Sequence, residues 1–478
     1  MKHLTLYLIF TLFTLISMAQ LPLPIDTITV GGTQIEVRIV AQNRVIPWDL
    51  AWASDGWLWF SERNGNVIRT RPENGYIEQV FHIEESFESP ENSGLHALAL
   101  HPNFPETPYI YVHFTYTWDA SRVVRYTFDE ANLTLTDRFV IQDSIWGSSS
   151  HNGSRIVFSP EGDKMFVAMG DGYQAERAQD YNDLNGAILR YNLDGSIPED
   201  NPFPGSAVWS YGHRNPQGLV FGTNGLLYST EHGTSNHDEI NVIEKGRNYG
   251  WPIVEGICNT PPEEFLCEQE NIRAPIYDYE WTWAVCGMAY YDHPAIPEWR
   301  NKLLVTSLKG GDGASGQRLQ LFHLKSTGIV VDSVWDYFAN TFGRLRDVMT
   351  TPDGRIFFCT SNQEINGDNV RKPNDDVIVE LRNVELDYST PPVGQNPIDF
   401  MQLGPIPALD VLYLRLPFYK GLAQLELTDL RGTKVWASEV EFFGARVPIE
   451  KGEFGPGLYW LRIELEDGSS AIRKVIFN

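Results

Sequence analysis

The sequence predicts an all-β protein: a six-bladed β-propeller followed by a small C-terminal β-sandwich. Three features of the 478-residue chain support this: aromatic residues make up 13% of it, Gly and Pro are abundant at 40 and 29 residues, and no long heptad or amphipathic helical pattern occurs. Gly and Pro end strands in tight turns, whereas helices avoid them. The composition therefore indicates many short strands in one large domain plus a small one.

A strand–turn–strand pattern recurs along the first four fifths of the chain. An apolar strand leads into a turn that ends in Gly, and a second apolar strand follows it. The four turns are Asp55-Gly56, Glu161-Gly162, Asn224-Gly225 and Asp353-Gly354, and each is a β-hairpin signal. Hairpins at comparable spacing favour radial repetition of sheets around a channel. A β-sandwich does not account for the length, and a parallel barrel needs helices that the sequence does not show.

The N-terminal residues 1–19 have the pattern of a signal peptide. Lys2 precedes an apolar run from Leu4 to Ile16, and Ser17-Met18-Ala19 is a small-x-small cleavage site. The run is shorter than the roughly 20 residues that span a bilayer, so no stable membrane insertion is expected. The sequence thus predicts export through the periplasm to the cell surface or the medium.

The formal net charge of -25 makes nucleic acid an improbable partner, because a phosphate backbone repels such a chain. Export also implies an oxidising compartment, in which cysteines can pair. Cys258 and Cys267 are close enough in sequence to close one loop, but the connectivity of the four cysteines cannot be deduced.

A Pro-rich linker, residues 390–398, separates the predicted propeller, residues 20–389, from an all-β tail, residues 399–478. The tail resembles the C-terminal sorting domain of type IX secretion cargo, through Leu427 to Gly432, Pro456 to Leu461 and Arg473 to Ile476. The resemblance implies that the tail delivers the chain to the type IX secretion machinery. An accessory β-sandwich, such as a carbohydrate-binding module, stays open as the alternative.

Polar segments follow apolar strands at places where the loops of a propeller meet near one end of the channel. In the first, Ser150 to Arg155, His151 has an ordinary pKa near neutrality and suits removal of a hydroxyl proton. Taken alone, His151 is better explained as a structural histidine. The second segment, Tyr211 to Gly218 with Thr230 to Thr234 after it, gathers donors and carboxylates around fixed Gly and Pro positions, which favours a functional role.

The third polar segment comprises Ser307 to Gly311 and Gly343 to Asp347. Its cations stand beside Gly in an otherwise acidic chain, and the planar guanidinium of Arg matches carboxylates. These features suit an anionic ligand, with a solvated basic loop as the alternative.

In this order the segments resemble the soluble pyrroloquinoline quinone (PQQ) dependent glucose/sorbosone dehydrogenase family, also called aldose sugar dehydrogenases. The resemblance runs from about Pro47 to Leu381 and includes Pro47 to Leu50, Leu100 to Phe104, Leu189 to Phe203, Gly212 to Gly218 and Asn248 to Pro252. A long ordered set is more specific than any single motif.

The resemblance implies a six-bladed propeller with PQQ over the channel and an aldose as substrate. His151 matches the catalytic base, which takes the proton of the anomeric hydroxyl while hydride passes to the quinone. Arg214 and Asn215 match residues that contact the quinone oxygens, so Arg214 would stabilise the charge that develops there. The residues implied to hold the rest of the cofactor are Lys309, Arg344 and Arg346 at its anionic groups and Trp281 over its ring.

The family also binds calcium against PQQ through backbone carbonyls, which here would belong to Gly233 and Thr234. Asp238 and Glu239 would serve a further calcium site or hold the loop. The chain departs from the family pattern at Ser150, which replaces an acidic residue before the base.

The sequence therefore predicts a secreted PQQ- and calcium-dependent sugar dehydrogenase that passes electrons to an external acceptor. One alternative is a calcium-dependent propeller lactonase or hydrolase, in which His151 activates water. The other is a non-catalytic surface propeller that binds sugar, against which the joint presence of His151, Arg214, Asn215 and Lys309 argues.

Overall fold

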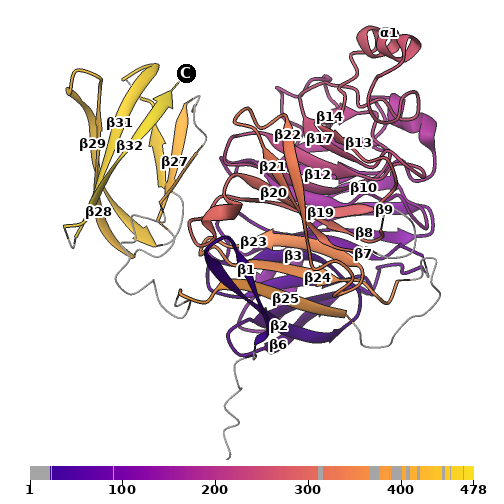
Figure 1. Ribbon diagram of the computed structural model, residues 1–478, viewed down its shortest axis with the longest axis horizontal. Helices are drawn as coiled ribbons and strands as arrows, with labels where there is room; N and C mark the ends of the chain where they lie inside the picture. Colours follow the sequence, from indigo (N-terminus) through magenta and orange to yellow (C-terminus); the bar gives the residue numbers. More distant parts are fainter. Residues whose placement is uncertain are drawn as a thin grey trace, which may run out of the picture.

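The computed structural model describes residues 22, 24–89, 91–310, 316–364, 376–386, 388, 401–404, 408, 410–416, 420–443, 447–452, 454–466 and 468–477. The signal peptide and the linker predicted above lie outside these residues. Nearly all regular structure is β, and Figure 1 shows the strands gathered into a large body and a smaller C-terminal unit.

Six antiparallel sheets make up the large body, and most are formed by four consecutive strands. Sheet 1 contains β3 (Pro47–Trp52), β4 (Leu58–Glu62), β5 (Asn66–Arg71) and β6 (Tyr76–His82). Sheet 2 contains β7 (Leu95–Leu100), β8 (Tyr109–Thr117), β9 (Ala120–Asp129) and β10 (Thr134–Trp146). Sheet 3 contains β11 (Arg155–Phe158), β12 (Lys164–Met169), β13 (Ala187–Asn192) and β14 (Val208–Tyr211).

The other three sheets follow the same plan. Sheet 4 contains β15 (Pro216–Phe221), β16 (Leu227–Glu231), β17 (Glu239–Ile243) and β18 (Tyr277–Asp278). Sheet 5 contains β19 (Val285–Tyr291), β20 (Lys302–Ser307), β21 (Leu319–Leu324) and β22 (Val331–Tyr337). Sheet 6 contains β23 (Leu345–Thr350), β24 (Ile356–Thr360) and β25 (Asp376–Asn383), completed from the N-terminal side by β2 (Thr33–Arg44) and β1 (Pro24–Val30).

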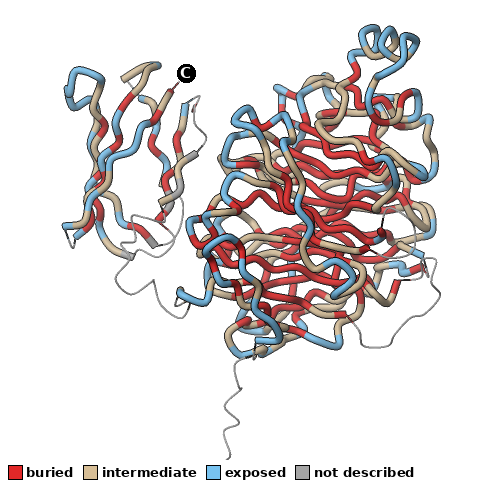
Figure 2. The backbone as a smooth tube through the Cα atoms, in the orientation of Figure 1, coloured by how far each residue is buried: buried red, intermediate tan, exposed pale blue. Residues whose placement is uncertain are grey.

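The first strands of the six sheets contact one another in a closed ring, in the order β3, β7, β11, β15, β19, β23 and back to β3. These strands are mostly buried, and β7 and β19 are buried throughout, whereas the outer strands β10 and β22 are largely exposed or half-buried. Figure 2 shows the resulting buried interior. Arg155 crosses this interior and pairs with Asp49 of β3 and, at 3.0 Å, with Asp347 of β23. The first strands therefore form the inner wall of the ring.

The four predicted hairpin turns are present. Gly56, Gly162, Gly225 and Gly354 take φ values of 90, 75, 81 and 85°, a conformation that Gly adopts without the strain of a side chain. Each turn joins the first two strands of its sheet. Aromatic side chains then pack neighbouring sheets together: Trp59 of sheet 1 meets Phe128 of sheet 2 edge-to-face, with ring centroids 4.9 Å apart.

The C-terminal strands form two smaller sheets. One contains β26 (Gln402–Gly404), β27 (Val411–Arg415) and β30 (Val447–Glu450); the other contains β29 (Lys434–Phe443), β28 (Lys420–Thr428), β31 (Gly457–Leu465) and β32 (Ser470–Phe477). Buried residues of both sheets, among them Leu412, Ile449, Leu427 and Ile463, belong to one hydrophobic cluster. The two sheets therefore share a core of their own (yellow in Figure 1).

Helices are few among the described residues: α1 (Pro261–Gln269) and the short 3-10 helices η1 (Ala175–Gln179) and η2 (Pro297–Trp299). The sequence analysis did not anticipate α1. Its start carries a capping box between Thr260 and Glu263, and a disulfide joins Cys258 to Cys267 across the helix. None of the described helices has the length and apolarity needed to cross a membrane.

Candidate active site

The predicted site residues lie at one end of the ring because of the antiparallel order of the strands. The start of a first strand, the end of the second and the start of the third all lie at the same edge of a sheet. His151 and Arg214 precede the first strands β11 and β15, and Lys309 follows the second strand β20. Arg344 immediately precedes β23, and Gly233 lies between β16 and β17. Four sheets thus direct these loops to the same end of the channel.

His151 is held by a carboxylate to which the sequence analysis gave no role. The Nδ1 atom of His151 lies 2.8 Å from Oδ1 of Asp171, which follows β12. Asp171 also accepts hydrogen bonds from the backbone N–H of Tyr173 at 2.9 Å and from the indole of Trp251 at 2.9 Å. A carboxylate accepts here, so Nδ1 carries the proton and Nε2 keeps a lone pair. Nε2 makes no hydrogen bond to the described part of the chain.

Two glycines bring the His151 loop against the end of β12. A side chain on Gly170 would collide with the carbonyl oxygen of His151, and one on Gly153 would collide with the backbone at Gly170. His151 itself has a φ of 57° and Gly153 one of 64°, both in the left-handed region. The loop places the imidazole in a fixed position, with 8% of the residue exposed.

The environment lowers the pKa of His151 below its ordinary value of 6.5. Burial is the main cause, and the positive charge of Arg214 adds to it. The hydrogen bond to Asp171 opposes both effects and prevents a larger fall. His151 is therefore neutral and able to accept a proton at neutral pH.

Arg214 and Asn215 are fixed by different partners. The backbone N–H of Arg214 donates to the buried carboxylate of Glu231, whose other oxygen lies 2.9 Å from Nδ1 of His213. The Arg214 guanidinium donates to the carbonyl of His232 at 3.0 Å. The amide oxygen of Asn215 accepts from the backbone of Gly153 at 3.1 Å, so this residue holds the loop of the base in place.

His232 lies at the centre of the predicted residues, a position that sequence reasoning missed. Its pKa is lowered well below the ordinary value, first by burial and then by Arg214, Arg346, His151 and Lys309. Residues from sheets 3 to 6 therefore lie within electrostatic reach of one imidazole. The Nδ1 atom is 3.4 Å from the amide nitrogen of Asn215, and the buried Nε2 has no hydrogen-bond partner among the described residues.

Arg344 and Arg346 meet at a buried glutamate, Glu364, which follows β24. Arg344 is 2.9 Å from its Oε2, and Arg346 contacts the same oxygen. The Arg346 guanidinium also stacks 4.0 Å from the ring centroid of Trp48 in β3. Arg344 donates to the carbonyl of Leu308 at 3.0 Å, which ties it to the loop of Lys309. The structure thus brings together the three cations predicted to hold anionic groups.

The predicted calcium residues lie in one tight turn. Both oxygens of Asp238 accept hydrogen bonds, from Gly233 N at 2.9 Å, Thr282 Oγ1 at 3.0 Å and Trp283 N at 2.7 Å. Its carboxylate therefore holds the loop. Glu239 is buried beside Glu231 and Asp278, and burial with the charge of Glu231 raises its pKa well above the ordinary value. The described residues contain no cluster of three or more His, Cys, Asp or Glu side chains able to hold a metal.

Trp281 differs from the other predicted residues. It is 58% exposed, and no contact with the other candidates is observed among the described residues. Instead, one aromatic ring lies against His151: the ring of Tyr173, a residue that is 56% exposed, has its centroid 4.0 Å from that of the imidazole. Trp146 donates to the carbonyl of Gly172 at 3.1 Å, and its ring meets the exposed Trp118 edge-to-face. Tyr173 therefore presents an aromatic surface to solvent beside the base.

Comparisons with known proteins find relatives among glucose and aldose sugar dehydrogenases. The family model described as Glucose / Sorbosone dehydrogenase matches residues 45–368. Quinoprotein glucose dehydrogenase B of Acinetobacter calcoaceticus is 29% identical, over 78% of this chain and 94% of that protein. The aldose sugar dehydrogenase of Escherichia coli strain K12 is 29% identical, over 68% of this chain and 90% of that protein. The structure of the PQQ-bound aldose sugar dehydrogenase of Streptomyces coelicolor matches with 31% identity and a TM-score of 0.63, over 73% of this chain and 98% of that one.

Proposed function

Because the chain belongs to the glucose/sorbosone dehydrogenase family of oxidoreductases, we propose that it is a secreted quinoprotein that oxidises the anomeric hydroxyl of aldoses to lactones with PQQ and calcium. The observation that carries the proposal is the pairing of His151 with Asp171 at the same end of the ring as a buried cluster of arginines. The six sheets are interpreted as six propeller blades around the site.

The described residues fit an anionic cofactor. Positive charge collects in an otherwise acidic chain, with Arg214, Arg346 and Lys309 all acting on His232. The Nε atoms of Arg214 and Arg346 and Nε2 of His232 are buried without a hydrogen-bond partner among the described residues. Buried polar atoms are normally satisfied, so these three atoms suit the oxygens of a ligand. Carboxylate groups match both the charge and the donors.

Calcium fits the turn from Gly233 to Glu239. Burial and the charge of Glu231 disfavour the ionised form of Glu239, and a hard cation beside this carboxylate would favour that form. Asp238 accepts two hydrogen bonds at each carboxylate oxygen, so it belongs to the turn rather than to the ligands. Glu239 accepts only one at each oxygen, from Gly256 N at 2.8 Å and from Asn241 Nδ2 at 2.9 Å, and so keeps lone pairs for an ion. The carbonyls of Gly233 and Thr234, with Glu239 nearby, are the groups proposed to face the ion.

The chain's own residues account for proton removal. PQQ, when bound, supplies the acceptor for the hydride that leaves the anomeric carbon. His151 receives the hydroxyl proton at Nε2, because Asp171 holds the proton on Nδ1 and fixes the ring. Asp171 then stabilises the imidazolium that forms. Arg214, held by Glu231 and His232, would bind a cofactor oxygen and stabilise negative charge on it.

The exposed ring of Tyr173 supports a sugar as substrate. The C–H faces of a pyranose ring pack well on aromatic side chains, whereas its hydroxyls need polar partners. Tyr173 stands directly over the base, so a ring bound against it would bring its anomeric hydroxyl near His151.

The proposal is tested by titrating the purified apoprotein with PQQ in the presence of calcium and then screening aldoses with a reducible dye. We expect bound quinone, visible in the absorbance spectrum, and dye reduction that requires both PQQ and an aldose. Bound PQQ without activity on a broad aldose panel would contradict the proposal. Lactone hydrolysis by a protein that binds no quinone would favour the lactonase alternative instead.

The export route is part of the same proposal. Residues 1–19 would direct the chain to the periplasm, and the tail, residues 399–478, would direct it to the type IX secretion machinery. The two C-terminal sheets with their own core are compatible with a separate sorting domain. Deleting the residues after Ser389 in a host with this machinery should retain the protein in the periplasm. Unchanged export would assign the tail another role.

A further inference from the structure

Three arginines converge on one carboxylate at the site. Arg63, which follows β4, lies 3.7 Å from Oε1 of Glu364, while Arg344 and Arg346 contact Oε2. Ser361 also donates to Oε2 at 3.1 Å. The side chains of Arg63 and Glu364 are both 0% exposed, and that of Arg346 is 1% exposed. The cluster joins sheet 1 to sheet 6 inside the ring.

The charges in this cluster do not cancel. Burial alone would raise the pKa of Glu364, but Arg346, Arg344 and Arg63 outweigh it and lower that pKa to about 2. Glu364 is therefore ionised and supplies one negative charge to three guanidiniums. Glu88, 41% exposed, offsets part of the charge of Arg63 at 3.2 Å. Positive charge remains for a ligand.

Glu364 determines which guanidinium atoms are left for that ligand. Arg346 uses Nη1 for Gln217 at 3.2 Å and Nη2 for Glu364, and its buried Nε has no partner among the described residues. Arg63 donates from Nη1 to the carbonyl of Glu91 at 2.8 Å, and its Nε is likewise buried and unpartnered in the described part of the chain. Glu364 thus acts as a clamp: it orients the guanidiniums around it and leaves some of their N–H donors unused.

We propose that Glu364 is a positioning residue for cofactor uptake: it holds Arg344 and Arg346 together against their mutual repulsion, in the orientation that binds the carboxylates of the cofactor. This inference rests on the proposed function and adds a residue that contacts no reacting atom. The change in PQQ affinity that it predicts is opposite in sign to the change expected from net charge alone. Removing an anion from an anion-binding site should strengthen binding by electrostatics, whereas losing the clamp should weaken it.

The test compares Glu364→Gln with a matched control, Glu380→Gln. Glu380 is also a buried glutamate between two arginines, 3.1 Å from both Arg38 and Arg355, but it contacts none of the candidate site residues in the described part of the chain. PQQ affinity is measured by titration of the apoprotein, and thermal stability by calorimetry, both without sugar. We expect both variants to melt at lower temperature, and only Glu364→Gln to weaken PQQ binding, by about 10- to 100-fold, as residues that orient ligand-binding groups do.

A second variant, Glu364→Asp, keeps the charge but shortens the side chain by one carbon. It should melt at or above the melting temperature of Glu364→Gln, because it keeps the charge, and still bind PQQ several-fold more weakly than the wild type, since its carboxylate cannot reach both arginines. Unchanged or tighter PQQ binding in Glu364→Gln and Glu364→Asp would overturn the role of Glu364 but would leave the proposed function standing. A wild-type chain that binds no PQQ would overturn the proposed function itself.

Discussion

The two sides of the candidate site use a buried carboxylate for different chemistry. In sheet 3, Asp171 holds His151, whose imidazole can be neutral or charged and whose Nε2 can take up a proton. In sheet 6, Glu364 holds Arg344 and Arg346, whose charges are permanent. The comparison teaches that the partner decides the function: the same anion orients a proton acceptor on one side and an anion-binding group on the other.

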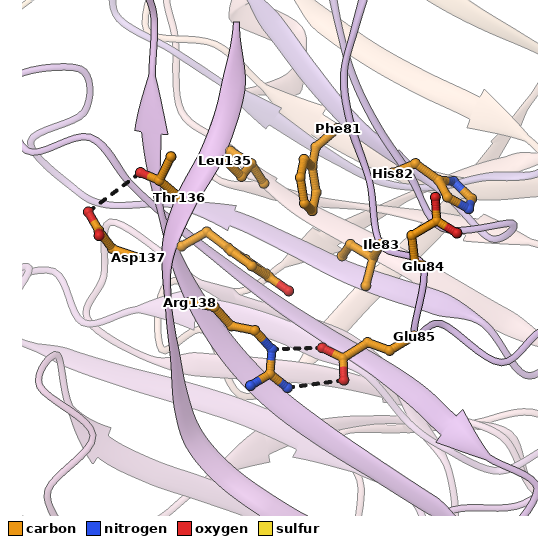
Figure 3. A pocket seen from close by; sticks show the side chains of 10 residues that line it. Phe81, His82, Ile83, Glu84, Glu85, Leu135, Thr136, Asp137 and Arg138 are labelled. Atoms are coloured by element: carbon orange, nitrogen blue, oxygen red, sulfur yellow. Dashed lines mark hydrogen bonds and ion pairs between the residues drawn. The ribbon is translucent and has the colours of Figure 1, made fainter. Parts of the chain in front are cut away.

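The largest difference between the two sides should appear when the base is removed. We expect His151→Ala to lower kcat/KM for an aldose by about 10²- to 10⁴-fold, the contribution of a positioned general base. PQQ affinity should change little, because the arginine side remains intact. Steady-state kinetics and PQQ titration measure the two effects. His82→Ala is the control, since His82 ends the outer strand β6 and lines a pocket between sheets 1 and 2 that contains none of the candidate site residues (Figure 3).

Neutralising only Asp171 tests how much the carboxylate contributes on the side of the base. Asp171→Asn should lower kcat/KM by about 10- to 100-fold, because the imidazole loses its orientation. It also has a pH signature. His151 is active when neutral, and its pKa lies below 6.5, so wild-type kcat/KM should rise with pH and level off below neutrality. Asp171 raises this pKa, so the variant's rise should occur at lower pH. A shift to higher pH would contradict the assignment.

Calcium affects a third region, the turn at Gly233. Chelation should lower the melting temperature and abolish PQQ-dependent activity. Calcium at about 100 times its Kd should add about 2.7 kcal/mol to stability. Glu239→Gln should reduce this calcium response, whereas Asp238→Asn should destabilise the turn with or without calcium. Calorimetry with and without chelator separates the two, and an unchanged response in Glu239→Gln would remove Glu239 from the site.

The smallest effect is expected at the sugar. Tyr173→Ala should raise the KM for aldoses roughly five-fold, about 1 kcal/mol, through loss of a stacking surface. Its effect on PQQ affinity should be negligible. Tyr76→Ala serves as control, because Tyr76 is similarly exposed, at 52%, on sheet 1. A fall in kcat at constant KM would instead indicate that Tyr173 supports His151.

The sequence predicted those parts of the structure that local signals encode. Asp55-Gly56 and the three other Gly turns mark hairpins, because a glycine turn can be recognised from a few adjacent residues. The helix α1 also had a local signal, the run from Thr260 to Glu263, which was not recognised as a capping box. The order of the family motifs predicted His151, Arg214 and Arg346, which the structure brings to one end of the ring.

The partners of these residues could not be predicted, because they come from distant strands. Glu364 meets Arg63 only after sheet 6 closes the ring onto sheet 1, so no local sequence spacing predicts the pair. Asp171 stands in a Gly170-Asp171-Gly172 turn whose signal is shared with ordinary turns. Trp281, placed over the cofactor by resemblance, is largely exposed and far less engaged than Tyr173 or Trp251.

The central claim is that His151 removes a proton while the arginine side holds the quinone, and single-turnover spectroscopy tests it most directly. Wild-type protein and His151→Ala are each loaded with PQQ and calcium, then mixed with an aldose without any external acceptor. The account predicts rapid loss of the bound quinone's absorbance in the wild type and a far slower loss in His151→Ala, at equal PQQ content. Equal rates in the two proteins would contradict it.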